Sequence, residues 1–173
     1  MRKIYLFVLF FEGFIFFLNV NVCAQSNIAK DGFKIHVDSD GKFTTFEDTN
    51  RIIYNNISPR DSENKIVSVR SIKVKFNEDR KNIEKDIFND GQRNQIKKYK
   101  PFAIVYICSE TKKIIALSFV FRNINESDMG EINTVQLAQY RDRLKNELEV
   151  TELSFERKVA KHGVVKQSFK VFF

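Results

Sequence analysis

The residues best suited to chemistry in this chain are two histidines that lie far apart in the sequence. His36 falls in an alternating, strand-like stretch, and His162 falls in a turn-like run before Gly163. Imidazole can act as an acid, a base or a metal ligand, but a site needs converging partners. Neither histidine has a cysteine or histidine cluster beside it. We therefore interpret both as solvated surface residues, and we keep open an enzyme whose site brings them together with distant Asp and Glu residues.

Cysteine and acidic residues give no stronger signal. Cys108 ends an apolar run, and we expect an inert buried thiol because free cysteine is among the most buried residue types. Asp31, Asp38 and Asp40 lack the glutamate and glycine spacing of a calcium loop, so we assign them to turns. The sequence contains none of the common phosphate-binding, nucleophile-elbow, zinc-protease or C-x-x-C motifs. It therefore predicts no catalytic, cofactor-binding or metal-binding residue and no cofactor, and it favours a protein that is not an enzyme.

The charge balance is basic but spread thinly. The chain has 29 Lys and Arg against 22 Asp and Glu, a formal net charge of +7. Lys97, Lys98 and Lys100 would form a patch with Lys112 and Lys113 if the helix end and the turn that carry them meet. We otherwise interpret them as a solvated face and expect no nucleic-acid partner, since no concentrated basic stripe is present. Weak attraction to an anionic envelope surface or an acidic glycan stays open.

The N-terminal segment has the three parts of a secretion signal. A charged start at residues 2–3 precedes an apolar run over residues 4–18, and a Val-x-Ala site ends at Ala24. We predict cleavage after Ala24, which makes residues 1–24 a signal peptide and the protein exported, either periplasmic or secreted. After cleavage no transmembrane span would remain.

Two alternatives to simple cleavage stay open. An uncleaved anchor is disfavoured because the run is shorter than the about 20 apolar residues that a span needs. It also contains Glu12 near its centre. Lipid attachment at Cys23 is disfavoured because a small residue should precede the cysteine, whereas Val22 stands there.

The remaining residues, 25–173, are expected to form one domain. A domain takes roughly 100 to 200 residues. The chain is 43% apolar, has 18 Phe, and contains only 2 Pro and 6 Gly, which argues against disordered and linker-like classes. No repeat or linker divides it.

Alternation and turn residues predict the elements of the first half. Residues 33–38 alternate strictly and return through a turn to 43–46 as a hairpin. Residues 51–54 are also strand-like. A strand over 66–76 changes phase near Arg70, which a bulge would accommodate. A helix should then start at an Asn77 cap and stop at Gly91, with a weak continuation through residues 92–100.

The second half has the clearest pattern. Residues 102–108 and 114–121 read as a central hairpin, and Asn133 or Thr134 could cap a helix that contains Leu137 and Leu144. Residues 151–159 and 164–173 would form a last hairpin. This order predicts an α+β fold, with a mainly antiparallel sheet and two helices packed on one face. The expected core residues are Phe102, Ile104, Leu117, Phe119, Leu137, Leu144, Phe169 and Val171.

Residues 102–173 resemble the C-terminal domain of TonB-type energy transducers and similar small exported proteins of the Gram-negative envelope. The resemblance lies in the hairpin around Ser109–Lys113, the helix from Gln136 to Leu148, and a closing run that ends at Phe172. It implies a strand-rich periplasmic module that meets partners through an exposed sheet edge. The chain departs from a true transducer because Pro59 and Pro101 are its only prolines, so it has no long Pro-rich spacer.

These observations favour a non-enzymatic exported binding or protein-interaction module of a bacterial envelope, which contacts a protein partner through a sheet edge or an aromatic patch. We expect that edge at residues 51–54 or at the C-terminal strand. An inhibitor-like protein is a further alternative, which would associate with an enzyme at a salt-dependent rate.

Overall fold

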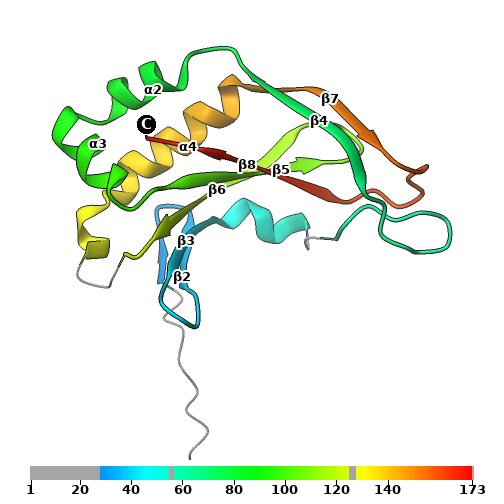
Figure 1. Ribbon diagram of the computed structural model, residues 1–173, viewed down its shortest axis with the longest axis horizontal. Helices are drawn as coiled ribbons and strands as arrows, with labels where there is room; N and C mark the ends of the chain where they lie inside the picture. Colours follow the sequence, from blue (N-terminus) through cyan, green and yellow to red (C-terminus); the bar gives the residue numbers. More distant parts are fainter. Residues whose placement is uncertain (1–27, 55–56, 125–127, 173) are drawn as a thin grey trace, which may run out of the picture.

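The computed structural model describes residues 28–54, 57–124 and 128–172, and it has the expected α+β class. The predicted signal peptide, its cleavage site and Cys23 lie outside the described residues. Six strands form one antiparallel sheet in the order β1-β2-β3-β6-β5-β8, and β4 pairs with β7 in a separate sheet (Figure 1). The strands are β1 (Ile28–Lys30), β2 (Phe33–Val37), β3 (Phe43–Asp48), β4 (Val69–Phe76), β5 (Phe102–Cys108), β6 (Ile114–Arg122), β7 (Leu148–Phe155) and β8 (Val164–Lys170).

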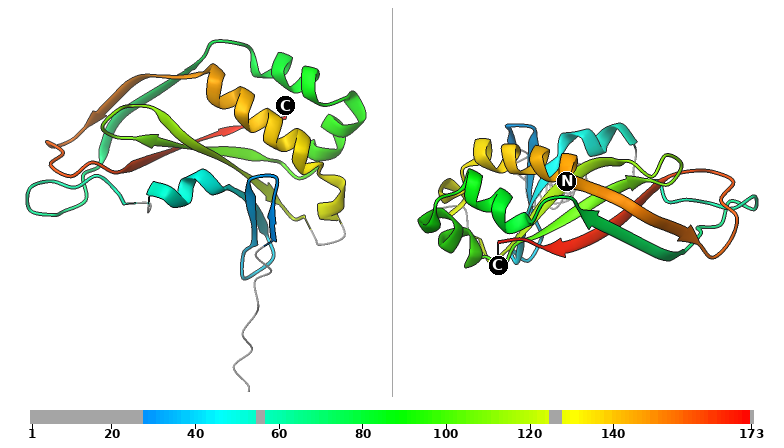
Figure 2. Two further views of the ribbon diagram at one scale, coloured as in Figure 1. Left: turned by 180° about the vertical axis from the view of Figure 1, so that it is seen from behind. Right: turned by 90° about the horizontal axis from the view of Figure 1, so that it is seen from above.

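Three α-helices and two short 3-10 helices complete the described elements. They are α2 (Arg80–Ile87), α3 (Asp90–Lys97), α4 (Thr134–Glu147), η2 (Thr49–Tyr54) and η3 (Asp128–Glu131). Helices α2 to α4 and the β4–β7 pair cover one face of the large sheet, and η2 lies against the other face (Figure 2). Within the described residues, no helix is both long and apolar enough to cross a membrane. We call the face under the helices the core face and the opposite one the far face.

The core face carries most of the buried apolar side chains. Alternate residues of β5 and β6, such as Val105 and Phe119, are fully buried there against Leu137 and Leu144 of α4. The central hairpin and the β2–β3 hairpin are thus confirmed, and Asn133 caps α4 by accepting hydrogen bonds from two backbone amides. All predicted core residues are buried or partly buried, but Phe102 and Ile104 are only half-buried on the far face.

The predicted last hairpin is wrong. Strand β7 follows α4 directly and pairs with β4, whereas β8 pairs with β5 in the large sheet. Because α4 lies in the covering layer, the strand that leaves it begins in that layer and reaches β4 first. The bulge expected near Arg70 is confirmed by a register shift between Val69 and Ser71.

Residues 51–54 belong to the 3-10 helix η2, so the strand predicted for them is wrong. The Asp48 carboxylate explains the change of course, because its Oδ1 accepts the Asn50 backbone N–H at 3.0 Å and favours a helical turn. Its Oδ2 accepts the Leu117 N–H, also at 3.0 Å. Asp48 is fully buried, and Arg141 and Lys145 of α4 lie 3.9 and 3.7 Å from its oxygens.

The single helix expected from Asn77 to Gly91 is two helices with different caps. Asp79 caps α2, and α2 ends before Phe88. Asn89 and Gln92 then form a reciprocal capping box that starts α3. This arrangement satisfies the free amides at the start of α3, so the weak continuation predicted for residues 92–100 is a helix as far as Lys97.

Glu84 connects three parts of the chain through one buried carboxylate. It lies on α2 and is 3% exposed. Its Oε1 accepts the Tyr140 hydroxyl of α4 at 2.7 Å and the Phe172 backbone N–H at 2.9 Å. Burial, reinforced by the Glu84 charge, raises the pKa of Tyr140 far above its usual range, so Tyr140 stays a donor. The end of β8 is therefore fixed beneath the helices.

We predict that Tyr140→Phe lowers the free energy of unfolding by about 1.5 to 3 kcal/mol, because a hydrogen bond to a buried charged group is lost without a change of ring packing. Urea unfolding followed by circular dichroism measures this change. Tyr99→Phe is the matched control, since the Tyr99 hydroxyl donates to the exposed Glu131. Equal losses in the two variants would contradict a special role of the Glu84 contact.

Candidate ligand-binding groove and open strand edge

A cavity of about 750 Å³ lies where β5 and β8 meet the end of α3. Its volume falls within the range of small-molecule sites. We call it the basic groove, and it is lined by Lys97, Lys100, Pro101, Phe102, Arg122, Ser168, Phe169, Lys170, Val171 and Phe172. Among the described residues, the lining thus combines aromatic and aliphatic side chains with four cations and no side-chain carboxylate.

Four separate segments supply the four cations. Lys97 ends α3, Lys100 precedes β5, Arg122 ends β6, and Lys170 ends β8. All four residues are exposed, and none forms an ion pair with a carboxylate of the described residues. The Arg122 guanidinium lies 5.6 Å from the centre of the Phe43 ring. The groove therefore has a positive rim without internal counter-charges.

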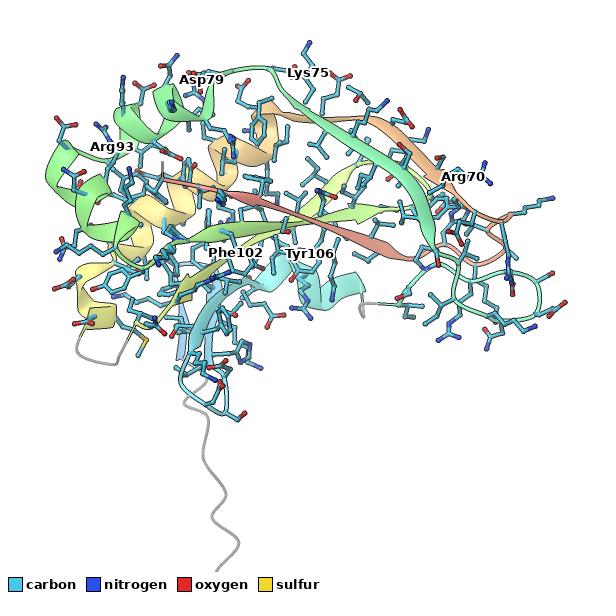
Figure 3. The ribbon with its side chains drawn as sticks, viewed as in Figure 1. Arg70, Lys75, Asp79, Arg93, Phe102 and Tyr106 are labelled. Atoms are coloured by element: carbon cyan, nitrogen blue, oxygen red, sulfur yellow. The ribbon has the colours of Figure 1, made fainter. Side chains whose placement is uncertain are left out.

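The register of the sheet places an apolar floor between these cations. Phe102 pairs with Val120 of β6 on one side and with Lys170 of β8 on the other. Phe102 and Tyr106 both lie on the far face of β5 (Figure 3). Arg51 of η2 donates to the Tyr106 hydroxyl at 3.1 Å, so that end of the face is covered. The Phe102 end forms the half-buried floor of the groove.

The neighbouring Tyr99 fixes the turn that carries Lys100 through two hydrogen bonds. The Tyr99 hydroxyl donates to Glu131 at 2.8 Å, and burial together with this contact raises the pKa of Tyr99 to about 12. The backbone oxygen of Tyr99 accepts the Arg122 N–H at 2.8 Å. Lys100 itself has a φ of 43°, in the left-handed region that favours glycine. The groove therefore includes a lysine at a strained position.

The predicted lysine patch divides between two ends of the sheet. Lys97 and Lys100 precede β5, whereas Lys112 and Lys113 follow it and line a different cavity that includes Glu149. Seven residues of strand separate them, which corresponds to about 20 Å. The first pair instead meets Arg122 and Lys170. No local feature of the sequence predicts that meeting, because sheet pairing creates it.

Strand β8 has one open side. The Gly163 carbonyl accepts the Ser109 backbone N–H, and the Val171 N–H donates to the Pro101 carbonyl, so both residues bond to the segment that contains β5. Because paired residues alternate in an antiparallel ladder, odd-numbered residues of β8 point their N–H and C=O toward β5. The even-numbered Lys166 and Ser168 point theirs away from it. No backbone hydrogen bond from elsewhere in the described residues reaches these two.

Both ends of this open side are closed by other segments. The Val164 N–H donates to Ile57 at 2.7 Å, and the Arg80 guanidinium donates to the Lys170 carbonyl. Gly163 permits the close passage of residues 57–58, since a Cβ there would lie 2.1 Å from the Ile57 oxygen. The free edge is therefore short, from Lys166 to Ser168, and it runs toward the basic groove.

The two histidines do not share a site. His36 on β2 contacts Glu47 at 2.6 Å on the far face, and Glu47 also binds Arg51 at 2.5 Å. His162 precedes β8, four strand positions away, which corresponds to about 19 Å across the sheet. The structure thus does not bring together the residues of the predicted distant site.

His162 has a structural neighbour. Its Nδ1 lies 3.3 Å from the Ser109 hydroxyl oxygen, which also accepts the Gly163 N–H at 2.8 Å. Ser109 is therefore engaged in joining the β5–β6 turn to the loop before β8.

Asp38 acts in a turn, as predicted, because its side chain accepts the Phe43 N–H at 2.8 Å. Asp40 pairs with Lys42 in the same turn, whereas the Asp31 side chain accepts the hydroxyl of Thr134 at the start of α4. In the parts of the chain that the structure describes, no group of three His, Cys, Asp or Glu side chains is placed to hold a metal ion.

Comparison with known proteins supports the fold alone. No protein-family model and no curated protein matches this chain. Among solved structures, it is similar to the crystal structure of a DUF5043 family protein from Bacteroides uniformis ATCC 8492, with a TM-score of 0.57 and 15% identity. The match covers 84% of this chain and 89% of that one. It therefore defines an α+β architecture without indicating a ligand.

Cys108 is partly buried, and its environment lowers the pKa of its thiol. Burial raises the pKa of the thiol, but hydrogen bonds from Thr111 and from the backbone of Glu110 lower it more, so the net pKa lies below its usual range. Cys108 is thus only partly buried, and not the inert buried thiol that the apolar run predicted.

We predict that alkylation of Cys108 by iodoacetamide, measured by mass spectrometry on residues 25–173, reaches half its maximal rate at a lower pH than alkylation of glutathione, because the thiolate is the nucleophile. Thr111→Ala should move this midpoint to higher pH. A wild-type midpoint at or above that of glutathione would contradict the assigned hydrogen bonds.

Proposed function

We propose that this chain is a non-enzymatic exported protein-interaction module of a bacterial envelope, and that it binds an extended segment of its partner along β8. The observation that carries the proposal is the open edge at Lys166 and Ser168. Unpaired N–H and C=O groups on an edge strand accept another strand, and main-chain hydrogen bonds then supply affinity. The TonB-like resemblance of residues 102–173 and the predicted signal peptide agree with this role.

Charge and length define what this edge accepts. Lys166, Ser168 and Lys170 project from the far face and are exposed. The incoming strand would therefore place acidic or polar residues opposite the lysines, since opposite charges on paired strands attract. Because both ends of the edge are closed, the segment pairs over a few residues.

Proline variants separate edge binding from stability. We predict that Ser168→Pro folds normally and abolishes capture, because its N–H points away from β5 and proline is tolerated at such positions. Gln167→Pro is the matched control. It removes a ladder bond to β5 and leaves an acceptor unpaired, which should cost about 1 to 3 kcal/mol of unfolding free energy.

The readout is photo-crosslinking in cells, with p-benzoylphenylalanine at Lys166 of the full chain. We expect one dominant crosslinked protein, which the Ser168→Pro background removes, and a purified segment of it that binds residues 25–173. The same probe at Lys34 of β2 is the control position. A product that survives Ser168→Pro, or that forms equally from Lys34, would overturn the proposal.

A further inference from the structure

We infer that the basic groove binds a small amphiphilic anion, a ligand with an apolar body and a carboxylate or phosphate head. This site is distinct from strand addition at β8, although Ser168 and Lys170 border both. Two properties of the groove carry the inference, namely its charge and its lining.

The positive charge of the basic groove favours an anionic ligand. Lys97, Lys100, Arg122 and Lys170 line one cavity from four segments, and none of the described lining residues has a side-chain carboxylate. Many other cations of the described chain, such as Arg93 and Arg143, have an acidic partner. Clustered like charges repel one another, so this arrangement is relieved when an anion binds between them.

The apolar side chains that line the groove favour a ligand with an apolar body. Phe102 is half-buried on the far face, and Phe169 is half-buried on the core face, where its ring packs on Phe76. The neighbouring Pro101, Val171 and Phe172 are buried. Ligand sites are mostly apolar, with a few charged groups that fix orientation. A cavity of about 750 Å³ accommodates a small molecule. An acidic peptide or glycan would use the rim without filling this floor.

The Lys100 backbone allows a matched control variant. Its φ of 43° lies in the left-handed region that favours glycine. Lys112 has a φ of 56° and follows β5 at the opposite end. These two exposed lysines form a matched pair, since Lys100→Gly and Lys112→Gly each remove one charge and relieve one strained backbone position. Only Lys100 lines the groove.

The test uses two fluorescent probes that differ in charge. 1-Anilinonaphthalene-8-sulfonate carries an anionic head, and N-phenyl-1-naphthylamine is its neutral counterpart. We expect residues 25–173 to bind the sulfonate at least roughly tenfold more tightly. Lys100→Gly should weaken sulfonate binding by roughly fivefold, whereas Lys112→Gly should leave it unchanged. Lys97→Gln is the second groove variant, in case Lys100→Gly alters the turn.

Displacement of the bound sulfonate then identifies the head group. Dodecanoate and dodecyl phosphate should displace it, dodecanol should not, and the stronger of the two anions distinguishes a fatty acid from a lipid phosphate. Equal binding of the neutral probe, equal effects of Lys100→Gly and Lys112→Gly, or displacement by hexaglutamate but not by dodecanoate would each overturn the inference. None of these outcomes bears on partner capture at β8.

Discussion

The buried carboxylate of Glu84 is the constraint on which the rest of the binding side depends. A carboxylate away from water is costly unless it is hydrogen-bonded, and removal of one partner leaves an uncompensated group. Tyr140 and the Phe172 N–H supply its hydrogen bonds, from α4 and from the residues after β8. Folding therefore has to bring the C-terminal strand beneath the helices. There β8 pairs with β5 on one side, and no strand of the described residues pairs with its other side.

The two faces of the sheet then receive unequal cover. Helices and the β4–β7 pair close the core face, whereas η2 covers only the part of the far face that contains Tyr106. The open edge of β8 and the basic groove both lie beyond the part of the far face that η2 covers. The open edge is a property of the backbone of β8, and the basic groove is a property of side chains at its end. A protein partner and an amphiphilic anion would therefore meet the domain side by side, with Ser168 and Lys170 bordering both sites.

Local pattern predicted the elements better than their partners. The alternation of residues 33–46, the apolar hairpin that contains Phe119, and the Asn133 cap each depend on neighbours in the sequence, and all three are confirmed. The pairing of β7 with β4 was missed because no local feature encodes which strand a strand will join. The groove was missed for the same reason, since Arg122 and Lys170 meet Lys100 only through sheet register. The alternation of Lys166, Ser168 and Lys170 indicates an exposed face but not an open edge, since β2 alternates in the same way and is paired on both sides.

Residue-resolved amide hydrogen exchange of residues 25–173 tests the open edge most directly. The register predicts an alternating result along β8, in which the amides of Gln167 and Phe169 are strongly protected by their bonds to β5. Those of Lys166 and Ser168 should exchange close to the rate of an unstructured peptide, because they point away from the sheet. Equal protection of all four amides would contradict the account, since it would mean that the outer side of β8 is already paired.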